Sequence, residues 1–228
     1  MCQSLIVCVC SSQIQAQSKS LSTELKRNKA SAGDDIFTQR NLDAVTRYLT
    51  SMESFSSRHN NEMRAKEFPP QHVWFNAEPL SMQRDLRGKL VLIDFWTYCC
   101  INCLHVLPDL EFLEQKFAGE NAIVFMGCHS AKFVNEKGAE KVRDAILKYE
   151  IKHPVINDDR MLVWRSFERR SWPGLVVLSP SQVPILILSG EGHRQVLDIF
   201  LSVAYDFYYE RLNHESTIRW QLEEQKAN

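Results

Sequence analysis

Residues 89–108 read KLVLIDFWTYCCINCLHVLP. The first eight residues form a nearly continuous apolar run, which is typical of a strand buried on both faces of a sheet. The residues that follow place apolar side chains on one stripe and predict a helix over 101–117. Three cysteines stand where the strand ends and the helix begins. Functional groups in open α/β sheets gather beyond the carboxyl ends of strands, so this junction is the expected site.

The three cysteines differ in their position relative to that helix. Cys100 stands at its expected N-terminus, where free N–H groups and the helix dipole lower the pKa of a thiol from about 8.5 toward about 7 or below. Cys103 follows one turn later on the same face, where it can attack a mixed disulfide formed on Cys100. Cys99 is interpreted as a neighbour that modulates this pair, with a regulatory disulfide as the alternative.

Asp94 lies inside the apolar run, six residues before Cys100. Burial would desolvate this carboxylate and raise its pKa, so that it could accept the proton of Cys103 when that thiol becomes a nucleophile. The alternative is a carboxylate at a bend that reaches solvent. We favour the proton-accepting role because perturbed carboxylates cluster at functional sites.

The rest of the pattern predicts an α/β fold. Further strands are expected over residues 72–76, 122–128, 174–179 and 184–189. The last two are separated by four residues, which is a hairpin length. Further helices are expected over residues 136–149, 161–167 and 193–212. This order of elements predicts a mixed central β-sheet flanked by helices on both faces.

The chain divides into three expected segments. Residues 1–67 form an N-terminal extension. Within it, residues 11 to about 40 are rich in Ser, Gln, Lys and Asp and are predicted to be disordered. A short amphipathic helix is expected over 41–52. Residues 68–212 form the folded domain, and residues 213–228 form a polar C-terminal tail.

Composition and charge exclude some classes of partner. The 228 residues are 44% hydrophobic and 24% charged, and the net charge is −1. No general attraction to nucleic acid or to an anionic membrane follows from that charge. No stretch approaches the roughly 18 apolar residues that a membrane helix needs. We therefore expect neither nucleic acid nor membrane as a partner, and we expect a monomer.

The use of cysteine bears on the cellular compartment. The chain has seven cysteines, an odd number with clustered spacing, whereas a secreted disulfide framework spreads an even number along a short chain. This favours a reducing, cytoplasmic location. Secretion is the alternative, because the apolar segment Leu5–Cys10 resembles a poor signal peptide, although no Lys or Arg precedes it.

Zinc binding is a competing interpretation of the same cysteines. The nearby ligand types are Cys99, Cys100, Cys103, His105, Cys128 and His129. Structural zinc normally takes two separated pairs of ligands. Cys128 and His129 are adjacent at the end of a strand and would point to opposite faces. We therefore predict no metal site.

Five short motifs occur together in this chain: DFWTYCCINC, HSAKFVNEK, HPVIND, SWP and GEGH. A proline also follows Cys103 by five residues, and a Trp-Pro pair follows about 70 residues later. These features resemble the thioredoxin-like fold. They resemble more closely the thioredoxin-like domain of the NHL-repeat-containing protein 2 family and its bacterial relatives of the TlpA type. The resemblance covers residues 68 to about 212.

The resemblance implies roles for individual residues. It implies that Cys100 is the attacking thiol, Cys103 the resolving thiol, Asp94 a buried acid and Pro173 a cis-proline.

Three aromatic or proline side chains are assigned to substrate binding: Trp96, Trp172 and Pro173. His129 is expected beside the thiols, where it would tune Cys100. A histidine on a surface loop is the alternative for that residue.

The predicted activity is that of a thiol–disulfide oxidoreductase of the protein disulfide reductase type. Its expected partners are protein disulfides and an external thiol reductant, and no bound cofactor is required. The alternative is a non-catalytic thioredoxin-like adaptor.

Departures from the family pattern motivate that alternative. Ile101-Asn102 stands in place of Gly-Pro, Cys99 in place of Trp, and Gly174 in place of Thr. The chain also ends at Asn228 without the β-propeller of the NHL-repeat protein, on which an adaptor would depend.

Overall fold

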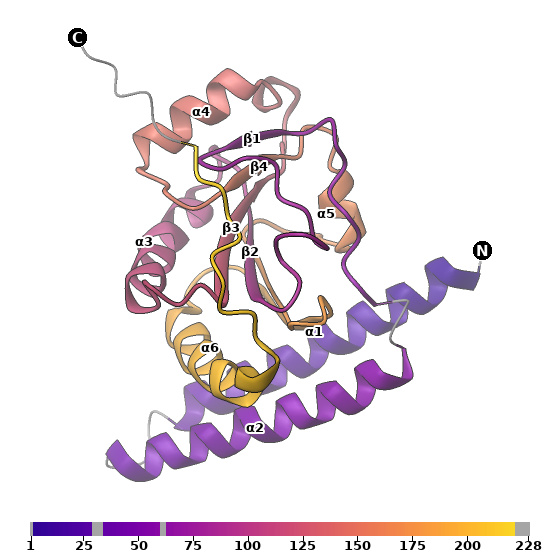
Figure 1. The fold of residues 1–228 in the computed structure, drawn as a ribbon, viewed down its shortest axis with the longest axis vertical. Helices are drawn as coiled ribbons and strands as arrows, with labels where there is room; N and C mark the ends of the chain where they lie inside the picture. The colour runs from indigo at the N-terminus through magenta and orange to yellow at the C-terminus, as the bar shows by residue number, and fades with distance from the viewer. Residues whose placement is uncertain (1, 29–33, 60–62, 222–228) are drawn as a thin grey trace.

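The computed structural model describes residues 2–28, 34–59 and 63–221 (Figure 1). The strands are β1 Val73–Phe75, β2 Leu90–Trp96, β3 Ile123–His129, β4 Val155–Asn157, β5 Gly174–Leu178 and β6 Pro184–Ser189. The α-helices are α1 Cys2–Asn28, α2 Asp34–Arg58, α3 Ile101–Lys116, α4 Ala139–Lys148, α5 Leu162–Ser166 and α6 Arg194–Tyr208. Two short 3₁₀ helices are η1 Val134–Glu136 and η2 Tyr209–Arg211.

The strands form one six-stranded sheet in the order β1-β4-β3-β2-β5-β6. The pairs β2–β3 and β3–β4 are parallel, whereas β1–β4, β2–β5 and β5–β6 are antiparallel. This confirms the predicted mixed sheet and places β2 at its centre, where every residue of the strand is buried. β4 was not among the predicted strands because three residues show no periodicity.

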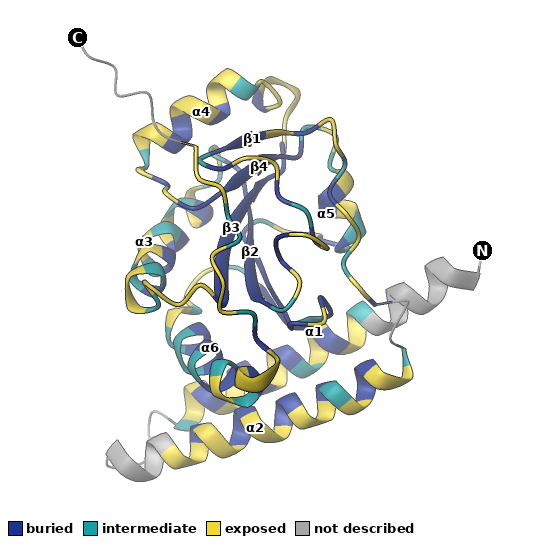
Figure 2. Cartoon of the chain, in the orientation of Figure 1, coloured by how far each residue is buried: buried dark blue, intermediate teal, exposed yellow. Residues whose placement is uncertain are grey.

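Helices cover both faces of the sheet, as predicted. Side chains alternate between the two faces along a strand, so Trp96 and its neighbour Phe95 point in opposite directions. Trp96 packs in a cluster with Cys103 of α3 and with apolar residues of α4. Phe95 packs edge-on against Trp164 of α5. Figure 2 shows the result, with buried strands inside and the exposed faces of the helices outside.

The N-terminal helices α1 and α2 lie side by side along α6 and β6 (Figure 1). The prediction of disorder over 11 to about 40 is therefore wrong for the described part of that segment. α1 buries a sparse stripe of Ile14, Leu21 and Leu25 in the main core. Such a helix gains most of its stability from tertiary packing, which its own sequence does not reveal. The helix expected over 41–52 is part of the longer α2.

These two helices also cover the edge of the sheet. β6 is an edge strand, and an uncovered edge would leave unpaired backbone groups. The amide of Ile187 donates to Ser18 Oγ at 2.9 Å, and Tyr48 Oη donates to the carbonyl of Ile185 at 2.7 Å. Ser18 Oγ and Tyr48 Oη are themselves 3.0 Å apart.

Residues 213–221 of the predicted tail lie against the domain. Lys89 is buried, and its ammonium donates to the carbonyls of Asn121, Asn213 and Glu215 at 2.7–3.0 Å. Further along, Trp220 forms a β-bridge with Ala77. Residues 222–228 of that tail lie outside the described residues.

The apolar segment Leu5–Cys10 falls within the backbone of α1, and its side chains lie outside the described ones. Within the described part of the chain, no helix is both long and apolar enough to span a bilayer.

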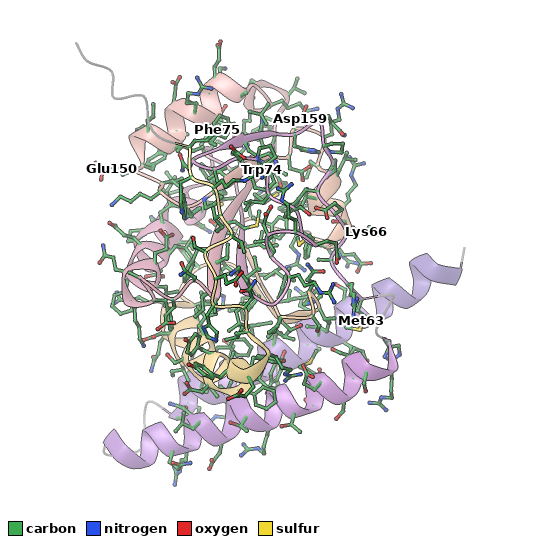
Figure 3. All side chains as sticks on the ribbon, viewed as in Figure 1. Met63, Lys66, Trp74, Phe75, Glu150 and Asp159 are labelled. Atoms are coloured by element: carbon green, nitrogen blue, oxygen red, sulfur yellow. The ribbon has the colours of Figure 1, made fainter. Side chains whose placement is uncertain are left out.

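Side chains fill the space between the sheet and its helices (Figure 3). At the β1 edge of the sheet, the successive residues Trp74 and Phe75 point to opposite faces and so pack in the two different layers of side chains. Phe75 belongs to the cluster that contains Trp96 and Cys103, whereas Trp74 belongs to the main core on the other face. The smaller cluster is thus the layer into which the cysteine motif projects.

Candidate active site

The two cysteines of the Cys-x-x-Cys motif occupy the first turn of α3. Cys100 is the residue that caps the N-terminus, with φ −95° and ψ 109°, and its amide donates to the carbonyl of Thr97 at 3.1 Å. Its carbonyl accepts from the amide of Cys103 at 3.0 Å. Cys100 is partly exposed, whereas Cys103 is fully buried. Solvent therefore reaches Cys100 and not Cys103.

The surroundings of Cys103 keep it protonated. Burial raises the pKa of its thiol, its hydrogen bond to the Cys100 side chain raises the pKa further, and the nearby charge of Asp94 acts in the same direction. The two cysteines are free thiols in this structure. The buried thiol must lose its proton before it can attack a disulfide.

Asp94 lies in the middle of β2 with no exposed surface. Neither of its carboxyl oxygens has a hydrogen-bond partner among the described residues. Burial without such partners raises the pKa of this carboxyl to about 8. The expectation of a desolvated carboxylate is confirmed, and the alternative of a carboxylate that reaches solvent is wrong.

Cys99 lies in a polar network that was not recognised in the sequence. Burial raises the pKa of its thiol, and the hydrogen bond to Glu136 together with the charge of that carboxylate raises the pKa further. Glu136 is buried and also accepts from Thr97 Oγ1 at 2.9 Å and from the amides of Lys132 and Phe133. The network holds Cys99 as a protonated thiol beside the reactive pair.

His129 at the end of β3 is buried, so the alternative of a surface loop histidine is wrong. Its ring stacks on Tyr98 at 5.3 Å between centroids and meets Trp96 edge-on at 5.2 Å. Its Nδ1 lies 3.3 Å from Asn157 Oδ1. Burial lowers its pKa to about 4, so the ring is neutral at pH 7. A neutral ring here supports the wall of the site, and its tuning of Cys100 stays a prediction.

Cys128 points to the opposite face of β3 from His129. It is buried, with its sulfur 3.6 Å from Ser130 Oγ and 4.0 Å from Asp158 Oδ2. Burial raises the pKa of this thiol well above its usual value. The second ligand pair considered for zinc is thus divided between two faces. Among the described residues, no three His, Cys, Asp or Glu side chains are grouped to hold a metal ion.

Residues 88–183 match the family model described as Thioredoxin-like. The fold agrees with that match: a putative thiol:disulfide interchange protein DsbE from Chlorobium tepidum superposes with a TM-score of 0.52 at 14% identity, over 62% of this chain and 95% of its own. The chain carries a thioredoxin-like domain.

Two longer proteins are similar in sequence to this chain over part of their own length. The chain is 51% identical over 142 residues to the chloroplastic protein SUPPRESSOR OF QUENCHING 1 of Arabidopsis thaliana. This alignment covers 62% of this chain and 13% of that protein. It is 40% identical over 179 residues to human NHL repeat-containing protein 2. That alignment covers 78% of this chain and 24% of the human protein. The chain thus spans about a quarter or less of the length of these relatives.

The residues assigned to substrate binding differ in exposure within the thioredoxin-like domain. Trp172 is partly exposed, stacks on Trp164 at 4.1 Å and donates from Nε1 to the carbonyl of Ser130 at 3.0 Å. The Trp172–Pro173 peptide bond is cis, and Pro173 itself is buried. Trp172 packs against the cluster that contains Cys103, as does Cys100.

Trp96 requires a correction. Its ring has no exposed surface and packs under α3 and α4, so a substrate docked on this structure does not reach it. The assignment of Trp96 to substrate binding is wrong for this reason, and the residue supports the site from below. Residues of β3, α3 and α4 cover its ring.

Glu136 and Thr97 are functional candidates that sequence reasoning missed. Thr97 follows the last residue of β2, and Glu136 ends η1 three residues after Phe133, the spacing at which an acidic side chain folds back onto backbone amides. That spacing was the available signal for Glu136. The contact of Glu136 with Cys99 depends on how β3 and η1 are placed in the thioredoxin-like domain. The sequence around either residue therefore does not predict this contact.

Proposed function

We propose that this chain is a thiol–disulfide oxidoreductase that works mainly as a reductase of protein disulfides. One observation carries the proposal. A partly exposed Cys100 caps α3, a buried Cys103 lies one turn further, and the buried carboxyl group of Asp94 lies beneath them. The substrates are protein disulfides, an external thiol reductant restores the dithiol, and the setting is the cytoplasm.

The chemistry divides into two exchanges. The Cys100 thiolate attacks one sulfur of the substrate disulfide, which forms a mixed disulfide and releases the other sulfur as a thiolate. Asp94 then takes the proton of Cys103, and the Cys103 thiolate attacks Cys100. The Cys100–Cys103 disulfide forms, and the second substrate sulfur leaves as a thiolate that takes a proton from water. Two electrons pass from the dithiol to the substrate, and two equivalents of an external thiol return them.

Trp172 is the proposed contact for the polypeptide on either side of the substrate disulfide. It is partly exposed and packs against the same cluster as Cys100. Its far side is held by the stacking on Trp164 and by the hydrogen bond to Ser130. An aromatic ring fixed in this way loses little conformational entropy when a substrate docks on it.

The test combines turnover with trapping. The full chain should reduce insulin with a small-molecule dithiol as the reductant, and C100S should abolish that activity. C103S should accumulate a mixed disulfide that gel electrophoresis without reductant detects. C128S is the matched control, because Cys128 is buried outside the motif, and it should retain turnover. Equal turnover by C100S, or no turnover by the unmodified chain, would sink the proposal and favour a non-catalytic adaptor.

A further inference from the structure

Four buried polar atoms near α3 share one feature. The two carboxyl oxygens of Asp94, Trp96 Nε1 and His153 Nε2 have no hydrogen-bond partner among the residues that the structure describes. Asp94 and Trp96 are two residues apart on β2 and so face the same side of the sheet. Buried polar atoms in native proteins are nearly always hydrogen-bonded to protein or to ordered water. This group therefore needs a physical explanation.

Gly127 of β3 brings these atoms together. It lies directly opposite Asp94 in the parallel β2–β3 pair, and paired strands are about 4.8 Å apart. A Cβ at position 127 would stand 3.0 Å from Trp96 Nε1 and 3.2 Å from His153 Nε2. Because position 127 has no side chain, the indole N–H, the imidazole nitrogen and Val155 Cγ2 all lie close to the backbone at the strand position opposite the carboxyl group.

His153 connects this group of unpaired atoms to the protein surface. Its Nδ1 lies 2.6 Å from Glu114 Oε1. An ionised carboxylate only accepts hydrogen bonds, so Nδ1 carries a proton; in the neutral ring, Nε2 then presents its lone pair toward Gly127. The Glu114 side chain is 23% exposed. Glu114 and His153 both line a surface cavity of about 370 Å³ between the end of α3, β3 and residues 216–220.

We propose that His153 and Glu114 form the exit route by which the proton that Asp94 takes from Cys103 reaches solvent, with an ordered water bridging the unpaired polar atoms beside Gly127. This inference rests on the proposed function, because it assigns the path of the proton released in the resolving step. A site of this kind holds water readily, since its donors and acceptors are otherwise unpaired. Trp96 Nε1 donates to that water and fixes its position.

The proton balance is simple. Cys103 gives its proton to the Asp94 carboxylate and becomes the nucleophile. Asp94 passes a proton to the water, which passes one to His153 Nε2. His153 then releases its Nδ1 proton to Glu114, and Glu114 exchanges with solvent. One proton leaves Cys103, one enters bulk water, and no oxidant or reductant is consumed on this path.

The layout of α3 fits this direction of transfer. Cys103 and Glu114 are 11 residues apart, which is about three turns, so they lie on the same face of the helix at opposite ends. Between them, that face covers the sheet with Leu110, which is buried. The titratable or charged groups that face the path are Asp94 from β2, Cys103 and Glu114 from α3 and, at the surface cavity, Glu120 and Lys152.

The experiment times the two exchanges separately by stopped flow. The probe is dithiobis-nitrobenzoate, an aryl disulfide that releases one coloured thiol when Cys100 attacks and a second when Cys103 resolves. The full-length background has four other cysteines replaced by serine: Cys2, Cys8, Cys10 and Cys99. His153→Gln is compared with this parent in light and heavy water across pH. The matched control is His105→Gln, which removes the exposed pairing of His105 on α3 with Glu191 in the segment before α6.

In H153Q the first release should keep its parent rate. The second should slow by about tenfold to about a hundredfold, since positioned proton transfer contributes at least that much to rates. Its solvent isotope effect should rise and its pH profile should change, which a merely structural role would not produce. E114Q should shift the second release in the same direction, and H105Q should not.

Two outcomes overturn the inference in different ways. A second release in H153Q that matches the parent in rate, isotope effect and pH profile rejects the exit route and leaves the oxidoreductase proposal intact. A parent that releases only the first thiol lacks a resolving step, and both proposals then fail. H153Q that does not fold is replaced by E114Q, whose glutamine keeps the shape of the partly exposed side chain.

Discussion

The carboxylate of Glu136 hydrogen-bonds the thiol of Cys99, the cysteine immediately before the reactive pair. Burial opposes ionisation of Glu136, but hydrogen bonds from Cys99, from Thr97 and from the amides of Phe133 and Lys132 outweigh it and lower the pKa of Glu136. The same contact raises the pKa of Cys99, after the larger effect of burial. The raised pKa favours the protonated form of this exposed thiol, which lies next to the Cys-x-x-Cys motif.

Replacing Glu136 with Gln should make Cys99 more reactive. The amide removes the negative charge that opposes formation of a thiolate, so the pKa of Cys99 should fall. The pH at which iodoacetamide alkylates Cys99 at half its maximal rate, followed by mass spectrometry of the peptide, should fall with it. Glu140→Gln is the control, because that exposed glutamate lies on α4 outside the network. Identical alkylation profiles in E136Q and the unmodified chain would show that the carboxylate does not restrain Cys99.

Asp94→Asn should stabilise the fold at neutral pH. The pKa of Asp94 is raised from 3.8 to about 8 in the folded chain. The folded chain therefore holds a proton that the unfolded chain has lost. The contribution of this group to stability is complete below pH 3.8, falls as pH rises and levels off above about 8. At 1.36 kcal/mol for each pH unit, the loss at pH 7 is on the order of 4 kcal/mol.

Urea unfolding between pH 4 and pH 9 checks this prediction. The unmodified chain should lose stability across that range, whereas D94N should have a flatter profile and a higher free energy of unfolding at pH 7. Asp144→Asn, on the exposed side of α4, is the control and should keep the original profile. Parallel profiles for D94N and the unmodified chain would mean that Asp94 titrates near its ordinary pKa.

The Asp94→Asn substitution also separates the effect of Asp94 on folding stability from its role in the proposed reaction. Only the ionised carboxylate can take the proton of Cys103. The resolving step should therefore accelerate as pH rises toward about 8, the pKa of Asp94. In D94N that acceleration should be absent and the step slower at every pH in the range, although the protein is more stable. A D94N profile that retains the rise would assign it to another group.

The β2–cysteine–α3 unit could be predicted because its signals are local. The apolar run, the spacing of Cys100 and Cys103 and the helical stripe all lie within 29 consecutive residues, from 89 to 117. Strand and helix periodicity act over such distances. The burial of Asp94 followed from its place in the run, and the mixed sheet followed from the order of the elements.

The partners of the site could not be predicted because they come from distant segments. Glu136 is 37 residues beyond Cys99, and His153 is 39 residues beyond Glu114. The pairing of β2 with β3 places Gly127 opposite Asp94, and the segment before β4 places His153 beside Gly127; these contacts join residues that are far apart in sequence. The assignment of Trp96 to substrate binding was wrong for a related reason, since α4, which helps to cover its ring, is remote in sequence.

Two hydroxyl groups that cover the β6 edge should contribute to stability together. Ser18→Ala leaves the amide of Ile187 without its acceptor, and Tyr48→Phe leaves the carbonyl of Ile185 without its donor. Each loss should cost about 1–3 kcal/mol, the usual penalty for an unsatisfied buried group. Because the two hydroxyls also contact each other, the double variant should deviate from additivity. Urea unfolding of the four proteins measures this, and a strictly additive cycle would contradict coupling across the helices.

Lys89→Met should release residues 213–221 from the domain. The ammonium of Lys89 holds the carbonyls of Asn213 and Glu215, and methionine keeps the apolar stem without the three donors. Burial lowers the pKa of this lysine, and the nearby charge of Glu215 acts in the opposite direction. Amide hydrogen exchange in residues 213–221 should accelerate at least tenfold, which corresponds to about 1.4 kcal/mol of lost protection. The exposed Lys137→Met is the control. Unchanged exchange in K89M would show that the bridge at Trp220 and the backbone pair of Gly88 with Asn213 suffice to hold this segment.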